Sequence, residues 1–345
     1  MAAASEAHDS SAPVMPICVL GAGSWGTALA VQFARTSRPT VLWGRDSAHL
    51  ALLARERRNN RYLPEAAFPA SLRIEPDISA ALHASRDILV AVPSHALREL
   101  LQEVARHRPE GMRLAWATKG FELATGMLPH QVAEQVLGSG VPTAVISGPT
   151  FAREVGAGLP TAMTIASNDA AFASALAQSL SGANFRAYTS SDMIGVEVGG
   201  AIKNVLAIGT GISDGLGFGA NTRIALIARG LVEMTRLGVA LGARKETLMG
   251  LAGLGDLVLT CTDDQSRNRR FGLALARGEE VAAAQKSIGQ VVEGVLAAKA
   301  VREVAARLGV EMPICEQVFR VVHQGLAPKA AVKELMSRAL RPETE

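Results

Sequence analysis

Short apolar segments alternate with amphipathic helical segments through the first half of this chain. The alternation is typical of a parallel sheet covered by helices on both faces. We expect the strands at residues 17–20, 39–46, 87–93, 114–119, 143–148 and 161–166. Ligands of open parallel sheets bind outside the carboxyl ends of the strands. One crevice is therefore expected to collect Pro93, Ser94, Lys119, Gly148 and Thr150.

The pattern changes near Ser190, where long helical runs rich in Ala, Leu, Gly and Val replace the short apolar segments. We see no clear strand pattern beyond this point, so we expect a helical second domain. The chain then divides into an α/β domain of residues 16–190 and an all-α C-terminal domain of residues 191–345. Residues 1–15 lack the basic start and apolar stretch of a secretory signal, and we expect them to be a disordered tail.

A glycine motif joins the first expected strand to the first expected helix. Gly21, Gly23 and Gly26 form Gly-x-Gly-x-x-Gly, and a helical run over residues 27–34 follows. In a dinucleotide site the first glycine permits a tight turn, the second admits the pyrophosphate, and the third lets helix and strand pack closely. The free N–H groups at the helix start attract the same anion. We therefore predict a Rossmann-type doubly wound sheet that binds a dinucleotide.

The second expected strand ends in a cation where the simplest NAD sites carry an acidic residue. Arg45 can hold a 2′-phosphate or stack on adenine, whereas Asp46 is expected to be the N-cap of the next helix. The cofactor is therefore NADP or NAD, and use of both stays open. In the alternative interpretation, Arg45 is a solvated loop charge.

The helical half begins with an apolar run in which Glu197 and Lys203 are the charged side chains. Gly199 and Gly200 in this run would each weaken a helix by about 1 kcal/mol, so they indicate close approach of another backbone or of the cofactor. Burial would lower the pKa of Lys203 toward the range useful for proton transfer. The alternative is a lysine that reaches the surface along an apolar helix.

A second polar cluster lies further along the helical half. Ser266, Arg267 and Asn268 present a hydroxyl, a guanidinium and a carboxamide in sequence, a donor set that suits a phosphorylated substrate. A solvent-exposed basic helix start would have the same sequence. Asp256, in a glycine-rich segment, is expected either to orient the lysine or a substrate hydroxyl, or to cap a helix.

Composition narrows the class of protein. The chain has 345 residues, 48% of them hydrophobic, and a net charge of +3 without a compact basic run, which argues against nucleic acid as a partner. The longest uncharged run, residues 135–152, contains prolines and glycines, so no membrane span is expected. The three cysteines lack metal-ligand spacing, and reduced, packed thiols are expected. We expect a cytoplasmic enzyme without a metal.

Several ordered motifs match one enzyme family. They lie at residues 21–28, 117–120, 147–152, 198–204, 253–256, 266–268 and 292–294. On these motifs the chain, from Pro16 onward, resembles the bacterial NAD(P)-dependent glycerol-3-phosphate dehydrogenases. The resemblance implies an oxidoreductase that interconverts dihydroxyacetone phosphate and sn-glycerol 3-phosphate, a small-molecule substrate, and a supply of backbones for glycerophospholipid synthesis.

The resemblance also implies roles for individual residues. Lys203 is the implied general acid and base. The implied substrate-binding residues are Lys119, Gly148, Thr150, Lys203, Asp256, Ser266, Arg267 and Asn268. Besides the three motif glycines, the implied cofactor-binding residues are Ser24, Trp25, Arg45, Tyr62, Lys119, Ala152, Arg267, Val291 and Glu293. The sequence leaves the oligomeric state open, with a homodimer as one candidate.

Three other functions compete with this one. A different dehydrogenase of the same build, acting on a hydroxy acid or acyl thioester, would not need the donor cluster at residues 266–268. A non-catalytic sensor of NAD(P) would make Lys203 dispensable. A DNA-binding regulator would need a recognition element and a basic face, which the sequence does not show.

Overall fold

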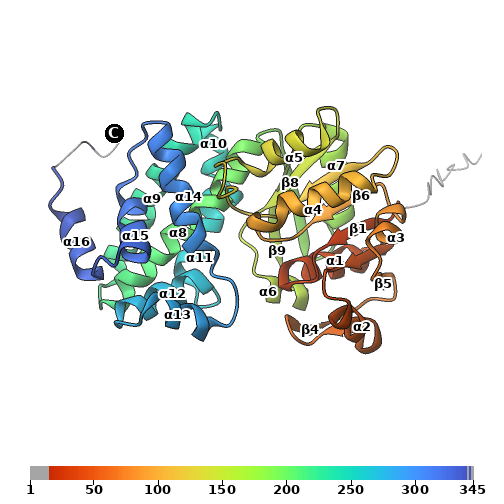
Figure 1. The fold of residues 1–345 in the computed structure, drawn as a ribbon, viewed down its shortest axis with the longest axis horizontal. Helices are drawn as coiled ribbons and strands as arrows, with labels where there is room; N and C mark the ends of the chain where they lie inside the picture. The colour runs from red at the N-terminus through yellow and green to blue at the C-terminus, as the bar shows by residue number, and fades with distance from the viewer. Residues whose placement is uncertain (1–14, 340–341, 343–345) are drawn as a thin grey trace, which may run out of the picture.

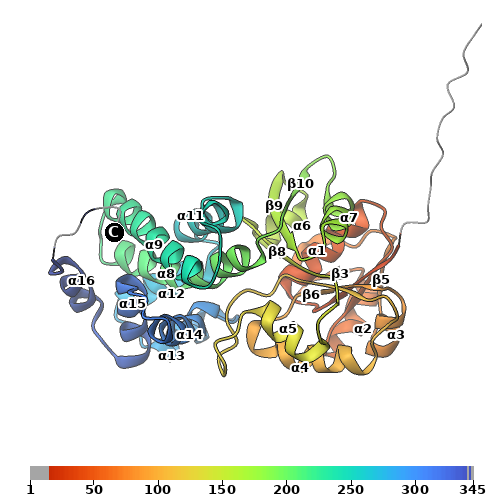
Figure 2. The ribbon, with the colours of Figure 1, turned by 90° about the horizontal axis from the view of Figure 1, so that it is seen from above.

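An eight-stranded sheet forms one half of the molecule, and helices alone form the other (Figures 1 and 2). The computed structural model describes residues 15–339 and 342. The expected tail therefore lies, apart from Met15, outside the described residues. In spatial order the strands are β10 (Phe185–Ser190), β9 (Thr161–Ser167), β8 (Thr143–Ser147), β7 (Arg113–Trp116), β6 (Asp87–Val90), β1 (Ile17–Leu20), β2 (Thr40–Trp43) and β5 (Leu72–Ile74).

The six expected strands are all present, but one of them runs in an unexpected direction. β9 extends the sheet as predicted, yet it pairs antiparallel to β8, with Ile146 opposite Ile165. β10 pairs parallel to β9, so both strands point against the rest. The carboxyl ends of β9 and β10 therefore lie at the opposite end of the sheet from those of the other strands, and they supply no side chains to the expected crevice. Strands β5 and β10 were not predicted, and neither was the hairpin of β3 (Arg58–Asn59) with β4 (Leu63–Ala67).

Alternate residues of each strand pack into two separate apolar layers. Val19 and Leu89 face α1 (Ser24–Arg35), α6 (Ala152–Ala157) and α7 (Ala170–Leu180), whereas Leu20 and Ile88 face the opposite layer. That second layer contains α3 (Ile78–His83), α4 (Ser94–Arg106) and α5 (Pro129–Leu137). The period of two along each strand gives the sheet two buried faces. The Rossmann-type doubly wound sheet is thereby confirmed.

The helical half is built around α8 (Met193–Gly215). The helices that follow are α9 (Ala220–Ala240), α10 (Lys245–Leu248), the π-turn Leu251–Gly255, α11 (Asp256–Thr262), α12 (Arg267–Ala276), α13 (Val281–Ile288), α14 (Glu293–Arg307), α15 (Pro313–Gln324) and α16 (Pro328–Met336). None of the described residues after Ser190 forms a strand, as expected. The proposed division at residue 190 itself remains a prediction.

Helix α8 can be so deeply enclosed because it has small residues where it crosses α12. A Cβ on Gly211 would lie 2.1 Å from the carbonyl oxygen of Arg269, and one on Gly272 would lie 2.2 Å from that of Ile208. The two backbones therefore touch. α8 is the one helix of the described residues long and apolar enough to cross a membrane, but 89% of its most apolar stretch is buried inside the fold.

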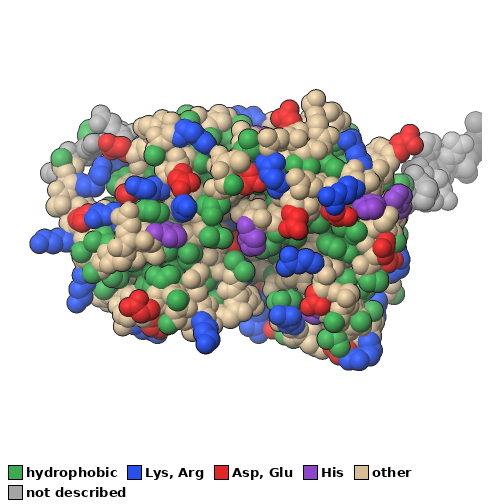
Figure 3. All heavy atoms as spheres, in the orientation of Figure 1, with side chains coloured by type: hydrophobic (Ala, Val, Ile, Leu, Met, Phe, Trp, Pro, Cys, Tyr) green, Lys and Arg blue, Asp and Glu red, His purple; other side chains and the backbone are tan. Residues whose placement is uncertain are grey.

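Surface charge and cysteines agree with the compositional expectations. Over the face shown in Figure 3, acidic and basic side chains are interspersed rather than gathered into a basic stripe. Cys18, Cys261 and Cys315 are free and buried, and burial raises the pKa of the Cys18 and Cys261 thiols to about 12. These are packed thiols, as predicted.

Candidate active site

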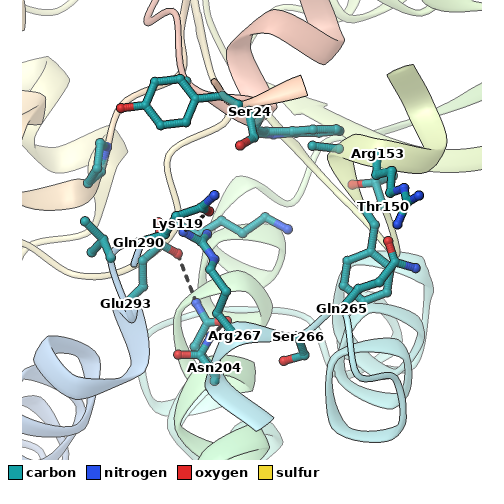
Figure 4. Close-up of a pocket in the computed structure, with 18 of the residues that line it drawn as sticks. Ser24, Lys119, Thr150, Arg153, Asn204, Gln265, Ser266, Arg267, Gln290 and Glu293 are labelled. Atoms are coloured by element: carbon teal, nitrogen blue, oxygen red, sulfur yellow. Dashed lines mark hydrogen bonds between the residues drawn. The ribbon is translucent and has the colours of Figure 1, made fainter. Parts of the chain in front are cut away.

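A large cleft lies between the carboxyl ends of the central strands and the helical half. Its volume is about 1200 Å³, which is above the several hundred Å³ typical of a site for a drug-sized ligand. The cleft therefore has room for a dinucleotide beside a small substrate. Figure 4 shows Ser24, Lys119 and Thr150 of the sheet half facing Asn204 and Arg267 of the helical half. Across residues 15–339 and 342, no cluster of three His, Cys, Asp or Glu side chains could hold a metal ion.

The turn after β1 has three glycines in three different environments. Gly21 has φ +127°, and a Cβ there would lie 2.4 Å from the carbonyl oxygen of Ala91. A Cβ on Gly26 would lie 1.9 Å from the carbonyl oxygen of Gly21, so helix and turn are in contact. Gly23 has nothing within 4 Å and lines the cleft. Neighbouring backbone therefore fills the space beside Gly21 and Gly26, whereas the space beside Gly23, where a pyrophosphate would approach, is free.

Most of the residues implied for the cofactor line this cleft. Besides Gly23 they are Ser24, Trp25, Tyr62, Lys119, Ala152, Arg267, Val291 and Glu293. The indole Nε1 of Trp25 is buried without a hydrogen-bond partner, a polar atom that a bound nucleotide could satisfy. The open turn and this free donor fit a dinucleotide.

Arg45 lies apart from this group. It is exposed in the loop between β2 and α2 (Ser47–Glu56) and is outside the set of cleft-lining residues. Its neighbour Asp46 caps α2, accepting a hydrogen bond from the His49 N–H at 3.0 Å, as expected. The ring of Tyr62 meets that of His49 edge to face at 5.5 Å. A contact between Arg45 and a 2′-phosphate remains a prediction.

Two lysines converge on one carboxylate at the centre of the cleft. Lys203 Nζ lies 2.5 Å from Asp256 Oδ1 and donates to Thr260 Oγ1 at 3.0 Å. Lys119 Nζ lies 2.7 Å from Asp256 Oδ2. Burial lowers the pKa of Lys203 to about 8, with Lys119 acting in the same direction and Asp256 against it. Lys203 is 8% exposed, so the alternative of a lysine reaching the surface is wrong.

The glycines of α8 place Lys203 in this position. A Cβ on Gly199 would lie 2.3 Å from the carbonyl oxygen of Ala252, so the π-turn that precedes Asp256 packs directly on the helix. A Cβ on Gly200 would lie 3.2 Å from Cγ of Lys119. The two glycines therefore admit one backbone and one lysine side chain. Close backbone approach was predicted here, and the structure identifies what approaches.

All three residues of the donor cluster line the cleft, and two of them are also engaged in hydrogen bonds within the fold. Ser266 caps α12 by accepting from the Arg269 N–H at 3.2 Å, and Asn268 donates to Asn204 Oδ1 at 2.9 Å while accepting from the Gly294 N–H at 2.8 Å. Both side chains are buried, which contradicts the alternative of a wholly exposed helix start. Arg267 presents its guanidinium to the cleft, 3.4 Å from Gln290 Oε1.

The expected crevice forms from only some of its residues. Pro93, Lys119 and Thr150 line the cleft, but Gly148 does not, because it packs against β9: a Cβ there would lie 2.9 Å from the Met163 Cα. Ser94 lines a small adjoining recess instead. The expectation that all five residues meet in one crevice is wrong for these two.

The sequence reasoning also missed two residues of the site. Asn204 lines the cleft beside Lys203 and donates to Glu293 Oε2 at 3.3 Å, linking α8 to α14. Thr260 accepts a hydrogen bond from Lys203. The Asn204 carboxamide, next to the lysine in an apolar helix, was an available signal. Thr260 carried no signal, because its distance from Lys203 depends on how α11 packs.

An open dinucleotide turn on one wall and a desolvated lysine on the other define the class of this protein, a nicotinamide-dependent dehydrogenase. The family models for the N-terminus and the C-terminus of NAD-dependent glycerol-3-phosphate dehydrogenase match residues 16–173 and 192–333. The chain belongs to this glycerol-3-phosphate dehydrogenase family.

Individual relatives agree with that assignment. The chain is 56% identical over 332 residues to a glycerol-3-phosphate dehydrogenase (NAD(P)+) of Edwardsiella ictaluri, covering 96% of this chain and 98% of the relative. It is 57% identical over 325 residues to one of Nitrosococcus oceani, covering 94% of each. A crystal structure of glycerol-3-phosphate dehydrogenase from Coxiella burnetii is similar with a TM-score of 0.91 at 50% identity, covering 94% of this chain and 99% of that one.

The three environments of the glycine turn predict separable effects of two alanine substitutions. Gly23→Ala should leave the melting temperature unchanged, since its Cβ enters open space, but it should weaken NADPH binding at least about tenfold by blocking the pyrophosphate. Gly26→Ala should instead lower the melting temperature, because its Cβ meets the turn backbone. Thermal melting and fluorescence titration with NADPH measure both effects. Equal NADPH affinity in Gly23→Ala and the wild type would contradict this assignment.

Proposed function

We propose that this protein reduces dihydroxyacetone phosphate to sn-glycerol 3-phosphate with NAD(P)H, and catalyses the reverse reaction. The observation that carries the proposal is the pair of lysines on the buried Asp256, beside an open dinucleotide turn. Membership of the family and relatives named for this activity over nearly the whole chain support it.

The chemistry divides between cofactor and protein. Bound NAD(P)H supplies the hydride that ketone reduction requires. Lys203, as the ammonium, donates the proton to the developing C2 oxyanion, and in the reverse direction its neutral form accepts one from the C2 hydroxyl. Lys119 stabilises the same oxygen as charge develops. Asp256 holds both ammonium groups in place and moderates their mutual repulsion, since each of its oxygens accepts from one lysine.

Substrate orientation is assigned to the start of α12. Arg267 is the cation of the donor cluster, it lines the cleft, and its fork suits a phosphate. Ser266 and Asn268 also line the cleft and would contribute to substrate binding, while their hydrogen bonds to the Arg269 N–H and to Asn204 hold the helix start in position. Binding energy from the phosphate would then orient the carbonyl carbon for hydride transfer.

Three wider roles accompany the proposal. The product would serve as a backbone for glycerophospholipid synthesis, the enzyme would work in the cytoplasm, and a homodimer is the oligomeric state to be tested. Residues 16–190 would bind the cofactor, and residues 191–345 would supply most of the catalytic groups. The sheet ends at Ser190 and α8 begins at Met193, which supports that division.

Parallel assays test the function and the cofactor choice together. Oxidation of NADH and of NADPH is followed with dihydroxyacetone phosphate and with unphosphorylated dihydroxyacetone. We expect turnover with the phosphate ester and kcat/KM at least about 10²-fold lower without the phosphate, since phosphate binding energy is used for orientation. Preference for an unphosphorylated ketone would favour the other dehydrogenase class. Binding of NADPH without any turnover would favour a sensor.

Lys203→Met should strongly reduce turnover while preserving the fold and NADPH binding. Loss of general acid–base catalysis should reduce single-turnover hydride transfer by roughly 10²–10⁴-fold. Because the pKa of Lys203 is about 8, wild-type reduction should slow as pH rises above 8, when the ammonium is lost, whereas oxidation should speed up until pH passes 8. Exposed Lys299 supplies the matched control, Lys299→Met, which should behave as wild type. A Lys203→Met rate within about tenfold of wild type would transfer the role to Lys119.

Arg267→Lys keeps a positive charge but removes the bidentate fork. We expect it to lower kcat/KM for dihydroxyacetone phosphate at least about tenfold, with a smaller loss of NADPH affinity. Arg277→Lys at the exposed end of the same helix is the matched control and should change neither. Steady-state kinetics with both substrates measure the effect. Unchanged substrate kinetics in Arg267→Lys would remove the arginine from the phosphate site.

Arg45→Ala tests whether Arg45 binds the 2′-phosphate of NADPH. If Arg45 pairs with the 2′-phosphate, its loss raises KM for NADPH at least about threefold more than KM for NADH, because an exposed charge pair is worth up to about 1 kcal/mol. Arg55→Ala, on the exposed side of the next helix, is the control. Equal changes for both cofactors would assign Arg45 to adenine stacking or to solvent.

A further inference from the structure

A buried carboxylate lies between the sheet and α8, outside the cleft. Glu197 Oε1 accepts a hydrogen bond from Trp116 Nε1 at 2.9 Å and another from the His130 backbone N–H at 2.9 Å. Glu197 Oε2 lies 2.5 Å from His130 Nδ1. The carboxylate side chain has no exposed surface, and Trp116 is fully buried. Neither oxygen faces the cleft, so nothing proposed above gives Glu197 a part in the reaction.

The three groups that contact Glu197 come from two elements, β7 and α5, and only β7 leads into the site. Trp116 ends β7, three positions before Lys119. Glu197 lies six positions before Lys203 on α8, which is about 9 Å along the helix axis. The Trp116–Glu197 bond therefore joins the strand that leads to one lysine with the helix that carries the other. His130 belongs to α5, none of whose described residues lines the cleft.

We propose that Glu197 is a positioning residue, whose hydrogen bond to Trp116 fixes α8 against β7 and so sets the separation of Lys203 and Lys119 around Asp256. The inference rests on the proposed function, because it concerns the geometry of that reaction. His130 supports this role, since its ring and its backbone N–H compensate for the loss of hydration of the buried Glu197 carboxylate.

The glycine contacts of α8 beside the site do not set its position relative to β7. Gly199 contacts the backbone of Ala252 and Gly200 contacts the side chain of Lys119, and neither of these residues belongs to β7. A directional hydrogen bond in a dry environment supplies that restraint, because a buried donor left without its acceptor costs about 1–3 kcal/mol. Burial raises the pKa of Glu197, and the hydrogen bonds from His130 and Trp116 oppose that rise.

Two acidic groups affect the charge of the His130 ring, and one of them, Glu197, is in contact with it. Burial by itself would lower its pKa, but Glu197 raises it above the usual histidine value, and Glu134 on α5 contributes in the same direction. A protonated ring would neutralise the Glu197 charge. His130 therefore stabilises the Glu197 carboxylate, while the indole N–H of Trp116 joins Glu197 to β7, the strand that leads to Lys119.

The test compares Glu197→Leu with Glu197→Gln. Leucine removes all three acceptor contacts, and we expect kcat for dihydroxyacetone phosphate reduction to fall at least about tenfold, since displacements near 1 Å in catalytic geometry reduce rates by about 10²-fold. The dissociation constant for NADPH should stay within about threefold, because the glycine turn is on another element. Glutamine retains a carbonyl oxygen for both N–H donors at Oε1 and should restore kcat to within about threefold of wild type.

Asp87→Asn is the matched control for a merely structural effect. Asp87 is another buried carboxylate, 1% exposed, which accepts from Arg113 at 2.6 and 2.7 Å at the start of β6, the strand end away from the cleft. We expect this variant to lower the melting temperature without changing kcat at temperatures where it is folded. If Glu197→Leu does not fold, Trp116→Phe removes the indole N–H donor while retaining an aromatic side chain, and it should lower kcat in the same way.

The outcomes separate this inference from the proposed function. An inactive wild type would refute the function itself. An active wild type with kcat unchanged in folded Glu197→Leu and in Trp116→Phe would overturn the positioning role alone. A fall in kcat that Glu197→Gln does not restore, or that Asp87→Asn reproduces, would also overturn it, because the effect would then come from the charge or from general destabilisation.

Discussion

The active site depends on one buried carboxylate that holds two ammonium groups together. Asp256 is 1% exposed, and each of its oxygens accepts from a different lysine, one from each half of the molecule. A lone charge at this depth would be strongly unfavourable, so each lysine requires Asp256, and the Asp256 carboxylate requires the lysines. The surrounding fold serves this requirement, since β7, α8 and the π-turn before α11 must all meet at one place.

Glycines make that meeting possible, and they do so in three separate parts of the chain. Gly26 allows α1 to touch the nucleotide turn, Gly199 allows the π-turn to touch α8, and Gly272 allows α12 to touch α8. In each case a methyl group would overlap a backbone carbonyl. The site is therefore held in part by direct backbone contacts, which require a residue without a Cβ at each of these positions.

Local sequence patterns predicted the elements better than they predicted the neighbours of each residue. The strands, the glycine turn, the Asp46 cap and the burial of Lys203 follow from periodicity, turn geometry and the absence of other charges nearby. The reversed direction of β9, the displacement of Gly148 from the cleft and the part of Thr260 depend on contacts between distant segments. A single sequence does not reveal such contacts. The hydrogen bonds of the Asn268 amide with Asn204 and Gly294 could not be predicted for the same reason.

The apolar layers reveal how far the two halves share a core. Val196 at the start of α8 and Ala252 of the π-turn pack into the same layer as the sheet residues Leu20, Ile88 and Trp116. The core of the sheet thus extends past the end of its last strand and includes two segments of the helical half. For chimaeras built from related enzymes, a crossover at residue 191 would join mismatched halves of one packed layer. Exchanging the helices that follow Ala252, while keeping residues 16–252 from one parent, would leave that layer intact.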